Sequence, residues 1–339
     1  MKTNATNADT SKPHAVTFAH MSDTLDAVTM SDSSDAATAS GTPRAFASSE
    51  AADLKKTASA PSSLAHCTLC PHACALHDGQ HGRCHARVAR GGNVVSENYG
   101  RITSLALDPI EKKPLARYFP GSTVLSVGSY GCNLSCPFCQ NARIACASEL
   151  DVPWREMTPT ELMNKALDLA QYDCIGIAYT YNEPLVGFEF VRDCAQLAHE
   201  CGLKNVLVSN GFINAEPLQK LAPFIDAANI DLKGFSSHFY HLVGGEIAPV
   251  QRTIEFLAQT ATCHVEITTL VVPGMNDDLQ HIDQLAAWIA HLNPEIPLHL
   301  SRFFPQHHMA KAQPTPRATM LAAQEVASAH LHTVLLGNM

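Results

Sequence analysis

Three cysteines within eight residues constrain this chain more than any other feature. Cys132, Cys136 and Cys139 stand in the stretch GCNLSCPFCQN, directly after a run of strand-forming residues. A disulfide framework needs an even number of partners, and a tetrahedral zinc site needs four ligands. Zinc would take a histidine here, but no histidine stands between residues 85 and 199. Three thiolates instead suit an iron–sulfur cluster with one iron open to an external ligand.

Composition indicates where in the cell the protein works and which classes of partner it does not bind. The chain has 339 residues, 46% of them hydrophobic, and a formal charge of −9, which argues against a dedicated nucleic-acid binder. No apolar run approaches the roughly 20 residues that span a bilayer, and the N-terminus lacks the apolar core of a signal peptide. We therefore expect a cytoplasmic protein without a membrane partner. In that reducing compartment, clustered cysteines indicate metal binding.

The chain divides into three parts by composition. Residues 1–62 are rich in Ala, Ser, Thr and Asp without sustained hydrophobic periodicity. They cannot bury enough apolar surface to offset their ordering entropy, which predicts a disordered extension. Residues 63–115 form a Cys- and His-rich segment that contains CTLCPHACALHDGQHGRC. Residues 116–339 are expected to form the core.

Strands and helices alternate through that core. Apolar, β-rich runs predict six strands, at residues 123–131, 174–181, 204–211, 228–234, 264–274 and 297–305. Thr158, Pro159 and Glu161 predict a capping box at the start of one intervening helix, and Thr315–Pro316 is expected to cap the last one. Such alternation implies right-handed βαβ units and a parallel sheet. The core is shorter than the roughly 250 residues of a full barrel, so we expect an α/β fold with a partial (β/α)6 TIM-like barrel.

Polar residues stand where these strands are predicted to end, the edge at which parallel barrels hold their active sites. They are the cysteine stretch after the first strand, Asn182 and Glu183 after the second, Ser209 and Asn210 after the third, and Asp231 and Lys233 at the end of the fourth. Glu266 and Thr268 alternate along the fifth strand, so both face either the barrel interior or a polar outer surface. Arg302, near the end of the sixth, is either a substrate anchor or a surface charge.

CNLSCPFC resembles the cluster-binding signature of radical S-adenosylmethionine (SAM) enzymes. With CTLCPHAC, DPIEKKPL, YTYNEP, IDLKG and VVPGMND, the chain from about residue 64 onward resembles the AmmeMemoRadiSam-system radical SAM enzymes. These are relatives of the pyruvate formate-lyase (glycyl-radical enzyme) activating enzymes. The resemblance implies a radical SAM core over residues 116–339, with a [4Fe–4S] cluster on Cys132, Cys136 and Cys139. It also implies reductive cleavage of SAM to methionine and a 5′-deoxyadenosyl radical, which abstracts hydrogen from an unidentified substrate.

The same resemblance assigns SAM-binding roles. Glu183, supported by Asn182, stands where activating enzymes bind the SAM ammonium, although Tyr181 and Asn182 replace two glycines there. The other residues expected near SAM are Phe138 beside the adenine, Ser209 and Asn210 at the ribose hydroxyls or the methionine carboxylate, Asp231 and Lys233 in the active-site wall, and Glu266. Each also has a structural alternative, such as a helix cap, a turn, a solvated lysine or a polar strand face.

A second group of four cysteines is compatible with more than one metal centre. Cys67, Cys70, Cys74 and Cys84 suit an auxiliary Fe–S cluster or structural zinc, and His66, His72 and His85 are available as substitute ligands. The spacing departs from the paired C-x2-C knuckles of most zinc ribbons. A third alternative is that this segment holds no metal.

The implied partners are an electron donor of the flavodoxin or ferredoxin type and two AmmeMemo partner proteins. Kinship with activating enzymes suggests a glycyl residue on a partner protein as hydrogen donor, while a small molecule stays equally open. The alternative class of protein is a catalytically inactive zinc-binding scaffold for partner proteins. A scaffold would need neither an open iron nor Glu183 beside it.

Overall fold

The computed structural model describes residues 64–339, so the extension predicted at residues 1–62 lies outside the described residues. The described chain builds an eight-stranded sheet of order β14-β13-β12-β11-β10-β9-β7-β6. Its strands are β6 (Ser104–Pro109), β7 (Thr123–Gly128), β9 (Cys174–Tyr179), β10 (Lys204–Ser209), β11 (Ala227–Asp231), β12 (His264–Val271), β13 (Leu298–Arg302) and β14 (Val334–Gly337). All neighbours are parallel except β6 and β7, which are antiparallel.

The expected α/β architecture is confirmed, with all six predicted strands in one parallel run from β7 to β13. Strands β6 and β14 are the two ends of the strand order, so the curved sheet stays open as a partial barrel. The sequence predicted short strands in the stretch that contains β6 but not their place in the main sheet, and β14 was absent from the prediction. The ladder partner of β6 is β7, which brings a strand of the 63–115 segment into the main sheet.

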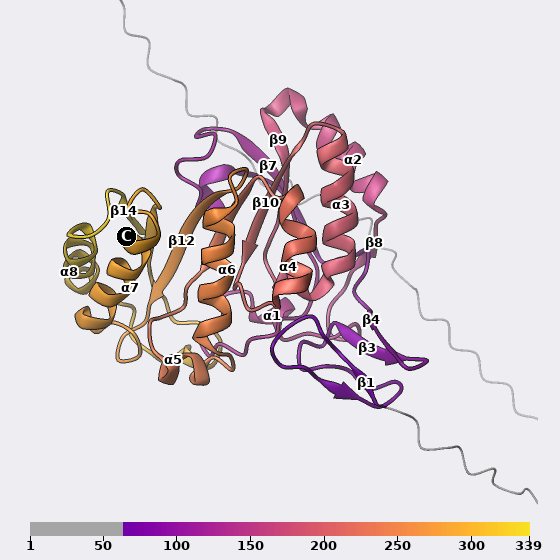
Figure 1. The fold of residues 1–339 in the computed structure, drawn as a ribbon, viewed down its shortest axis with the longest axis horizontal. Coiled ribbons are helices and arrows are strands. Elements are labelled where there is room, and N and C mark those ends of the chain that lie inside the picture. Colours follow the sequence, from indigo (N-terminus) through magenta and orange to yellow (C-terminus); the bar gives the residue numbers. More distant parts are fainter. Residues whose placement is uncertain (1–63) are drawn as a thin grey trace, which may run out of the picture. The chain divides into compact units, whose positions relative to one another are not determined.

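Helices follow the strands and pack along the sheet (Figure 1). The longer ones are α2 (Pro159–Asp168), α3 (Phe188–Glu200), α4 (Ala215–Leu221), α6 (Ile247–Gln259), α7 (Leu279–Leu292) and α8 (Arg317–Ser328). The capping box at Thr158 and Glu161 is confirmed at the start of α2. None of the described helices is long and apolar enough to cross a membrane.

The prediction that Thr315 caps the last helix is wrong. The N-cap residue of α8 is Pro316, which makes no side-chain capping bond. Thr315 is fully buried, and its Oγ1 donates to the carbonyl of Val271 at 2.6 Å and accepts from the amide of Phe303 at 3.2 Å. The hydroxyl thus satisfies the carbonyl of the last residue of β12 and the amide of the residue that follows β13, since unpaired buried polar groups are costly.

The Cys-rich segment folds into short antiparallel ladders. They pair β1 (Ala65–His66) with β2 (Ala75–Leu76), and β3 (Arg87–Arg90) with β4 (Asn93–Ser96). The amide of Cys132 donates to the carbonyl of Cys84 at 3.2 Å, so the two cysteine groups are adjacent. Gly131 permits this approach: its φ is +90°, and a Cβ there would lie 2.4 Å from the oxygen of Cys84.

Candidate active site

A cavity of about 680 Å³ lies at the carboxyl ends of the parallel strands. Its wall brings together most of the residues predicted from the sequence: Cys132, Cys136, Phe138, Cys139, Asn182, Glu183, Ser209, Asn210, Asp231, Lys233 and Thr268. Glu266 and Arg302 are not among the lining residues. Residues spread over more than a hundred positions therefore share one site, because parallel strands end at the same edge.

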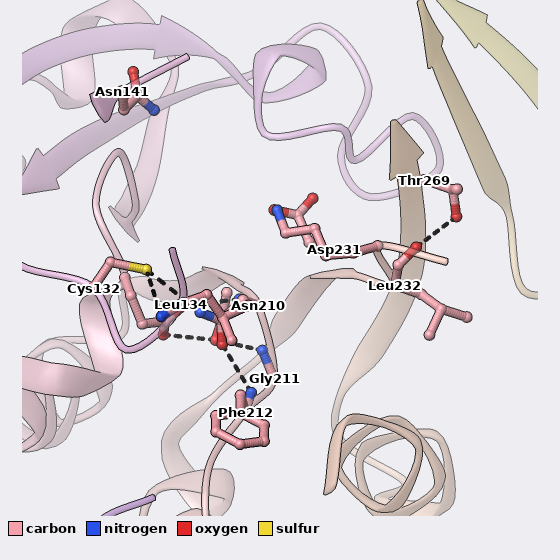
Figure 2. Close-up of polar contacts among 12 residues, drawn as sticks. Cys132, Leu134, Asn141, Asn210, Gly211, Phe212, Asp231, Leu232 and Thr269 are labelled. Atoms are coloured by element: carbon pink, nitrogen blue, oxygen red, sulfur yellow. Dashed lines mark hydrogen bonds and ion pairs between the residues drawn. The ribbon is translucent and has the colours of Figure 1, made fainter. Parts of the chain in front are cut away.

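The loop after β7 presents the three cysteines to the cavity. The Cys132 sulfur accepts from the backbone amide of Leu134 at 3.4 Å and from Nδ2 of Asn210 at 3.7 Å (Figure 2). The ring of Phe138, only 3% exposed, stacks on Phe239 with centroids 6.1 Å apart and closes one side. N–H groups aimed at a sulfur stabilise a thiolate, so this donor set fits an iron–sulfur cluster.

Burial keeps these thiols protonated without a metal. It raises the pKa of Cys132 well above its ordinary value, that of Cys136 to about 11, and that of Cys139 as well. A metal that binds here must therefore displace protons. Among residues 64–339, no three His, Cys, Asp or Glu side chains converge on a position for a single metal ion. A cubane differs, because each thiolate binds a different iron.

Glu183 sits at the end of β9 with both carboxylate oxygens engaged. Oε1 accepts from the hydroxyl of Ser209 at 2.8 Å and from the amide of Leu185 at 3.1 Å, and Oε2 accepts from the amide of Asn210 at 2.8 Å. Burial raises its pKa to about 7, although these hydrogen bonds act in the opposite direction. The helix cap predicted as the structural alternative is present, because Glu183 caps a short 3-10 turn, Pro184–Gly187.

Asn182 shapes the backbone that leads into the cysteine loop. Its Oδ1 accepts from the amide of Ser129 at 2.9 Å, and its Nδ2 donates to the carbonyls of Tyr130 and Gly131 at 3.1 and 3.0 Å. Both ends of this amide are therefore used within the chain. The geometry places Asn182 as a positioning residue for the loop rather than as a free donor to a ligand.

Asn210 and Lys233 complete the polar wall. Nδ2 of Asn210 also donates to Oδ1 of Asn133 at 2.8 Å, which orients its amide toward the cysteine loop. Nζ of Lys233 donates to Oδ2 of Asp231 at 2.7 Å. Although burial opposes it, the Asp231 carboxylate raises the pKa of Lys233, so it stays an ammonium. That cation lies in the electrostatic field of Cys136 and Cys139.

Glu266 does not line the cavity, although it was expected near SAM. Its fully buried carboxylate accepts from the amides of Ala116 and Arg117 at 3.0 and 2.8 Å, and from His264 and His299 at 2.9 and 2.5 Å. Burial alone would raise its pKa, but these hydrogen bonds hold it at about 2. Glu266 thus fixes the segment that follows β6 to β12.

Three residues in the same region were missed from the sequence. Nζ of Lys113 donates to Oδ2 of Asp108 at 2.8 Å, and the hydroxyl of Tyr181 donates to the same oxygen at 2.7 Å. Lys113 and Tyr181 line the cavity. Lys113 and Asp108 lie in the stretch DPIEKKPL, which carried the resemblance without an assigned role. The available signal was an acid near the end of a strand with paired lysines shortly after it.

The second cysteine group is folded, with three of its four thiols buried. Cys67, Cys70 and Cys84 are buried and Cys74 is partly buried, and all four are free thiols. Burial raises the pKa of Cys70 to about 11 and also raises that of Cys84. As at the first site, no three of these side chains converge on a position for a single metal ion, a finding that covers residues 64–339.

The fold and the cavity define a class of protein. The sequence profile of the Radical SAM superfamily matches residues 126–286, which run from β7 into α7. Residues 126–286 therefore carry a domain of this superfamily, whose members use a [4Fe–4S] cluster and SAM for radical chemistry. The matched region contains the cysteine loop and the cavity residues from Asn182 to Thr268.

Known proteins refine this assignment. The chain is 38% identical over 275 residues to the uncharacterized protein MJ0808 of Methanocaldococcus jannaschii, covering 80% of this chain and 81% of that protein. It is 27% identical over 161 residues to the pyruvate formate-lyase 1-activating enzyme of Escherichia coli K12, covering 44% of this chain and 61% of that enzyme. Streptococcus suis SuiB bound to S-adenosylmethionine shares the fold, with a TM-score of 0.50 at 12% identity over 63% of this chain and 51% of that one. The chain thus carries a radical SAM domain homologous to activating enzymes.

Proposed function

We propose that this protein is an activating-enzyme-like radical SAM enzyme of the AmmeMemoRadiSam type. The observation that carries the proposal is the convergence of Cys132, Cys136, Cys139 and Glu183 on one cavity at the strand ends. When bound, the cluster and SAM together supply the one-electron cleavage that yields methionine and a 5′-deoxyadenosyl radical. The hydrogen donor is a glycyl residue of a partner protein or a small molecule.

The chain's own residues bind and orient. The three thiolates hold the cluster, with Asn210 and the Leu134 amide donating to the Cys132 sulfur. Glu183 faces the cavity as an acceptor for the SAM ammonium. A cation beside it would favour its charged form and lower its pKa from about 7.

The remaining cavity residues have supporting roles in this proposal. Phe138 covers the adenine, Ser209 and Asn210 meet the ribose hydroxyls or the methionine carboxylate, and the Asp231–Lys233 pair lines the wall. Reduction comes from a flavodoxin or ferredoxin in the cytoplasm, and AmmeMemo proteins are the working partners. Cys67, Cys70, Cys74 and Cys84 hold an auxiliary cluster, because among residues 64–339 no three such side chains converge on one position as a zinc ion requires.

The test is anaerobic reconstitution with iron and sulfide, followed by dithionite and SAM. 5′-Deoxyadenosine, iron and zinc are measured on the wild type and on Cys132→Ala. We expect deoxyadenosine from the wild type and none from the variant. Iron that persists in the variant and disappears on a further Cys67→Ser exchange would assign an auxiliary cluster. Colourless protein that holds only zinc and makes no deoxyadenosine would overturn the proposal in favour of the scaffold.

A further inference from the structure

Lys113 is a buried amine in the cavity wall that the proposed function leaves unused. It is 3% exposed, yet it lines the cavity beside Tyr181. Its Nζ lies 2.8 Å from Oδ2 of Asp108 and 4.8 Å from the centroid of the Tyr181 ring. A buried ion pair does little for stability compared with apolar packing, so its position at a cavity wall suggests a chemical role.

The backbone of Tyr181, next to Lys113 in the cavity wall, is in a strained conformation. Its φ is +74°, in the left-handed region that residues other than glycine rarely adopt. Nδ2 of Asn141, just beyond Cys139, donates to its carbonyl at 2.7 Å and fixes that backbone. A Cβ at Gly128 would approach the Cβ of Tyr181 to 2.9 Å, so the absent side chain there makes room for the ring.

The groups that face Lys113 suit an amine nucleophile. Oδ2 of Asp108 accepts from Lys113 and from the Tyr181 hydroxyl, and Lys112 reaches Oδ1 at 3.5 Å. Burial lowers the pKa of Lys113 below its ordinary value, even though Asp108 raises it. A desolvated lysine yields its neutral, nucleophilic form more readily than a solvated one.

We propose that Lys113 forms an imine with a small aldehyde or ketone bound in the cavity. The ammonium loses one proton to water, and the neutral amine adds to the carbonyl carbon to give a carbinolamine. The hydroxyl then takes up one proton from water, which replaces the proton released in the first step, and leaves as water. The product is an iminium ion of the same charge as the starting ammonium, so Asp108 stays paired, and no electrons are transferred. This inference rests on the proposed function in one respect: the radical would act on a substrate held covalently in the same cavity.

Reductive trapping tests the inference. The anaerobically reconstituted protein is incubated with pyruvate or with hydroxyacetone, an anionic and a neutral ketone of similar size, and sodium cyanoborohydride. Intact mass and peptide mapping then locate the reduced adduct. We expect one adduct, on Lys113, with either ketone; a preference for pyruvate would show that the subsite also takes an anionic group. The assay uses neither SAM nor dithionite, so its failure is separate from a failure to make deoxyadenosine.

Two variants provide matched controls. Lys113→Arg keeps a cation for Asp108 but removes the nucleophile, so the adduct is lost while iron content and the unfolding transition stay unchanged. Lys112→Arg exchanges the adjacent lysine, whose side chain is 67% exposed, and keeps the adduct. If Lys113→Arg fails to fold, the wild-type peptide map still decides. No adduct with either ketone, or labelling spread equally over exposed lysines such as Lys220, overturns the proposal.

Discussion

Ser209 and Glu183 meet across the ends of two neighbouring strands, with the Ser209 hydroxyl donating to Oε1 of Glu183 at 2.8 Å. This hydrogen bond links the end of β10 to the loop that follows β9, on the cavity side of the sheet. Burial raises the pKa of this carboxyl group to about 7, although the hydrogen bond from Ser209 acts in the opposite direction. The cofactor-free protein therefore carries a group that takes up a proton near neutral pH.

Stability of the cofactor-free protein should fall as pH rises from 5 to 8. Glu183 binds its proton more tightly in the folded state, so its contribution is full below the ordinary carboxyl pKa and is lost as pH rises through about 7. The loss is on the order of 3 kcal/mol at most, since one pKa unit corresponds to about 1.4 kcal/mol. Urea unfolding at several pH values measures it. Glu183→Gln should flatten this dependence, and an unchanged slope in that variant would refute the assignment.

Cys136→Ser should abolish iron binding at the first site. The remaining two thiolates cannot hold three irons of the cluster, so iron, sulfide and visible absorption fall by the amount of one cluster. Cys146→Ser is the matched control, because Cys146 also lines the cavity but stands outside the three-cysteine spacing. Equal iron loss in both variants would contradict the assignment of the ligands.

Glu266→Ala should destabilise the fold by about 3–5 kcal/mol, because it leaves buried donors without their carboxylate. Those donors are the amides of Ala116 and Arg117 and two histidine rings. Since the pKa of Glu266 is held at about 2, this stabilisation is present above its ordinary pKa and is lost as pH falls toward 2. Urea unfolding at pH 7 tests the magnitude. The exposed Glu216→Ala should change little, and a similarly small effect at Glu266 would be inconsistent with a role as anchor.

Gly131→Ala should separate the two cysteine groups and lower iron retention. The new Cβ would lie 2.4 Å from the oxygen of Cys84 at a φ of +90°, so the backbone must shift. Strain at such a φ alone costs about 1–3 kcal/mol. Gly79→Ala has a φ of +79° but nothing within 4 Å, so it isolates the backbone strain from the clash. Thermal unfolding and iron content should be worse for Gly131→Ala; equal behaviour of the two would disprove the packing argument.

The sequence by itself determined the parallel core and the location of the site. Hydrophobic runs and the capping box at Thr158 are local signals, which act over a few residues and so can be found without a structure. The three cysteines are equally local, and the geometry of parallel strands explains why Glu183 and Asn210 lie at the same edge. Strand β14 was missed, because a four-residue strand near the C-terminus gives a weak pattern. Short strands were predicted around β6, but its antiparallel pairing with β7 in the main sheet was not.

Only the tertiary structure decided what each polar side chain contacts. Glu266 was expected toward the cavity, but its carboxylate binds amides about 150 positions earlier in the chain. Asn182 uses its amide to hold the cysteine loop, and Tyr181 meets Asp108 across 73 positions. Such pairs depend on how distant segments pack and on which buried donors and acceptors then need partners. Local sequence periodicity carries no information about either.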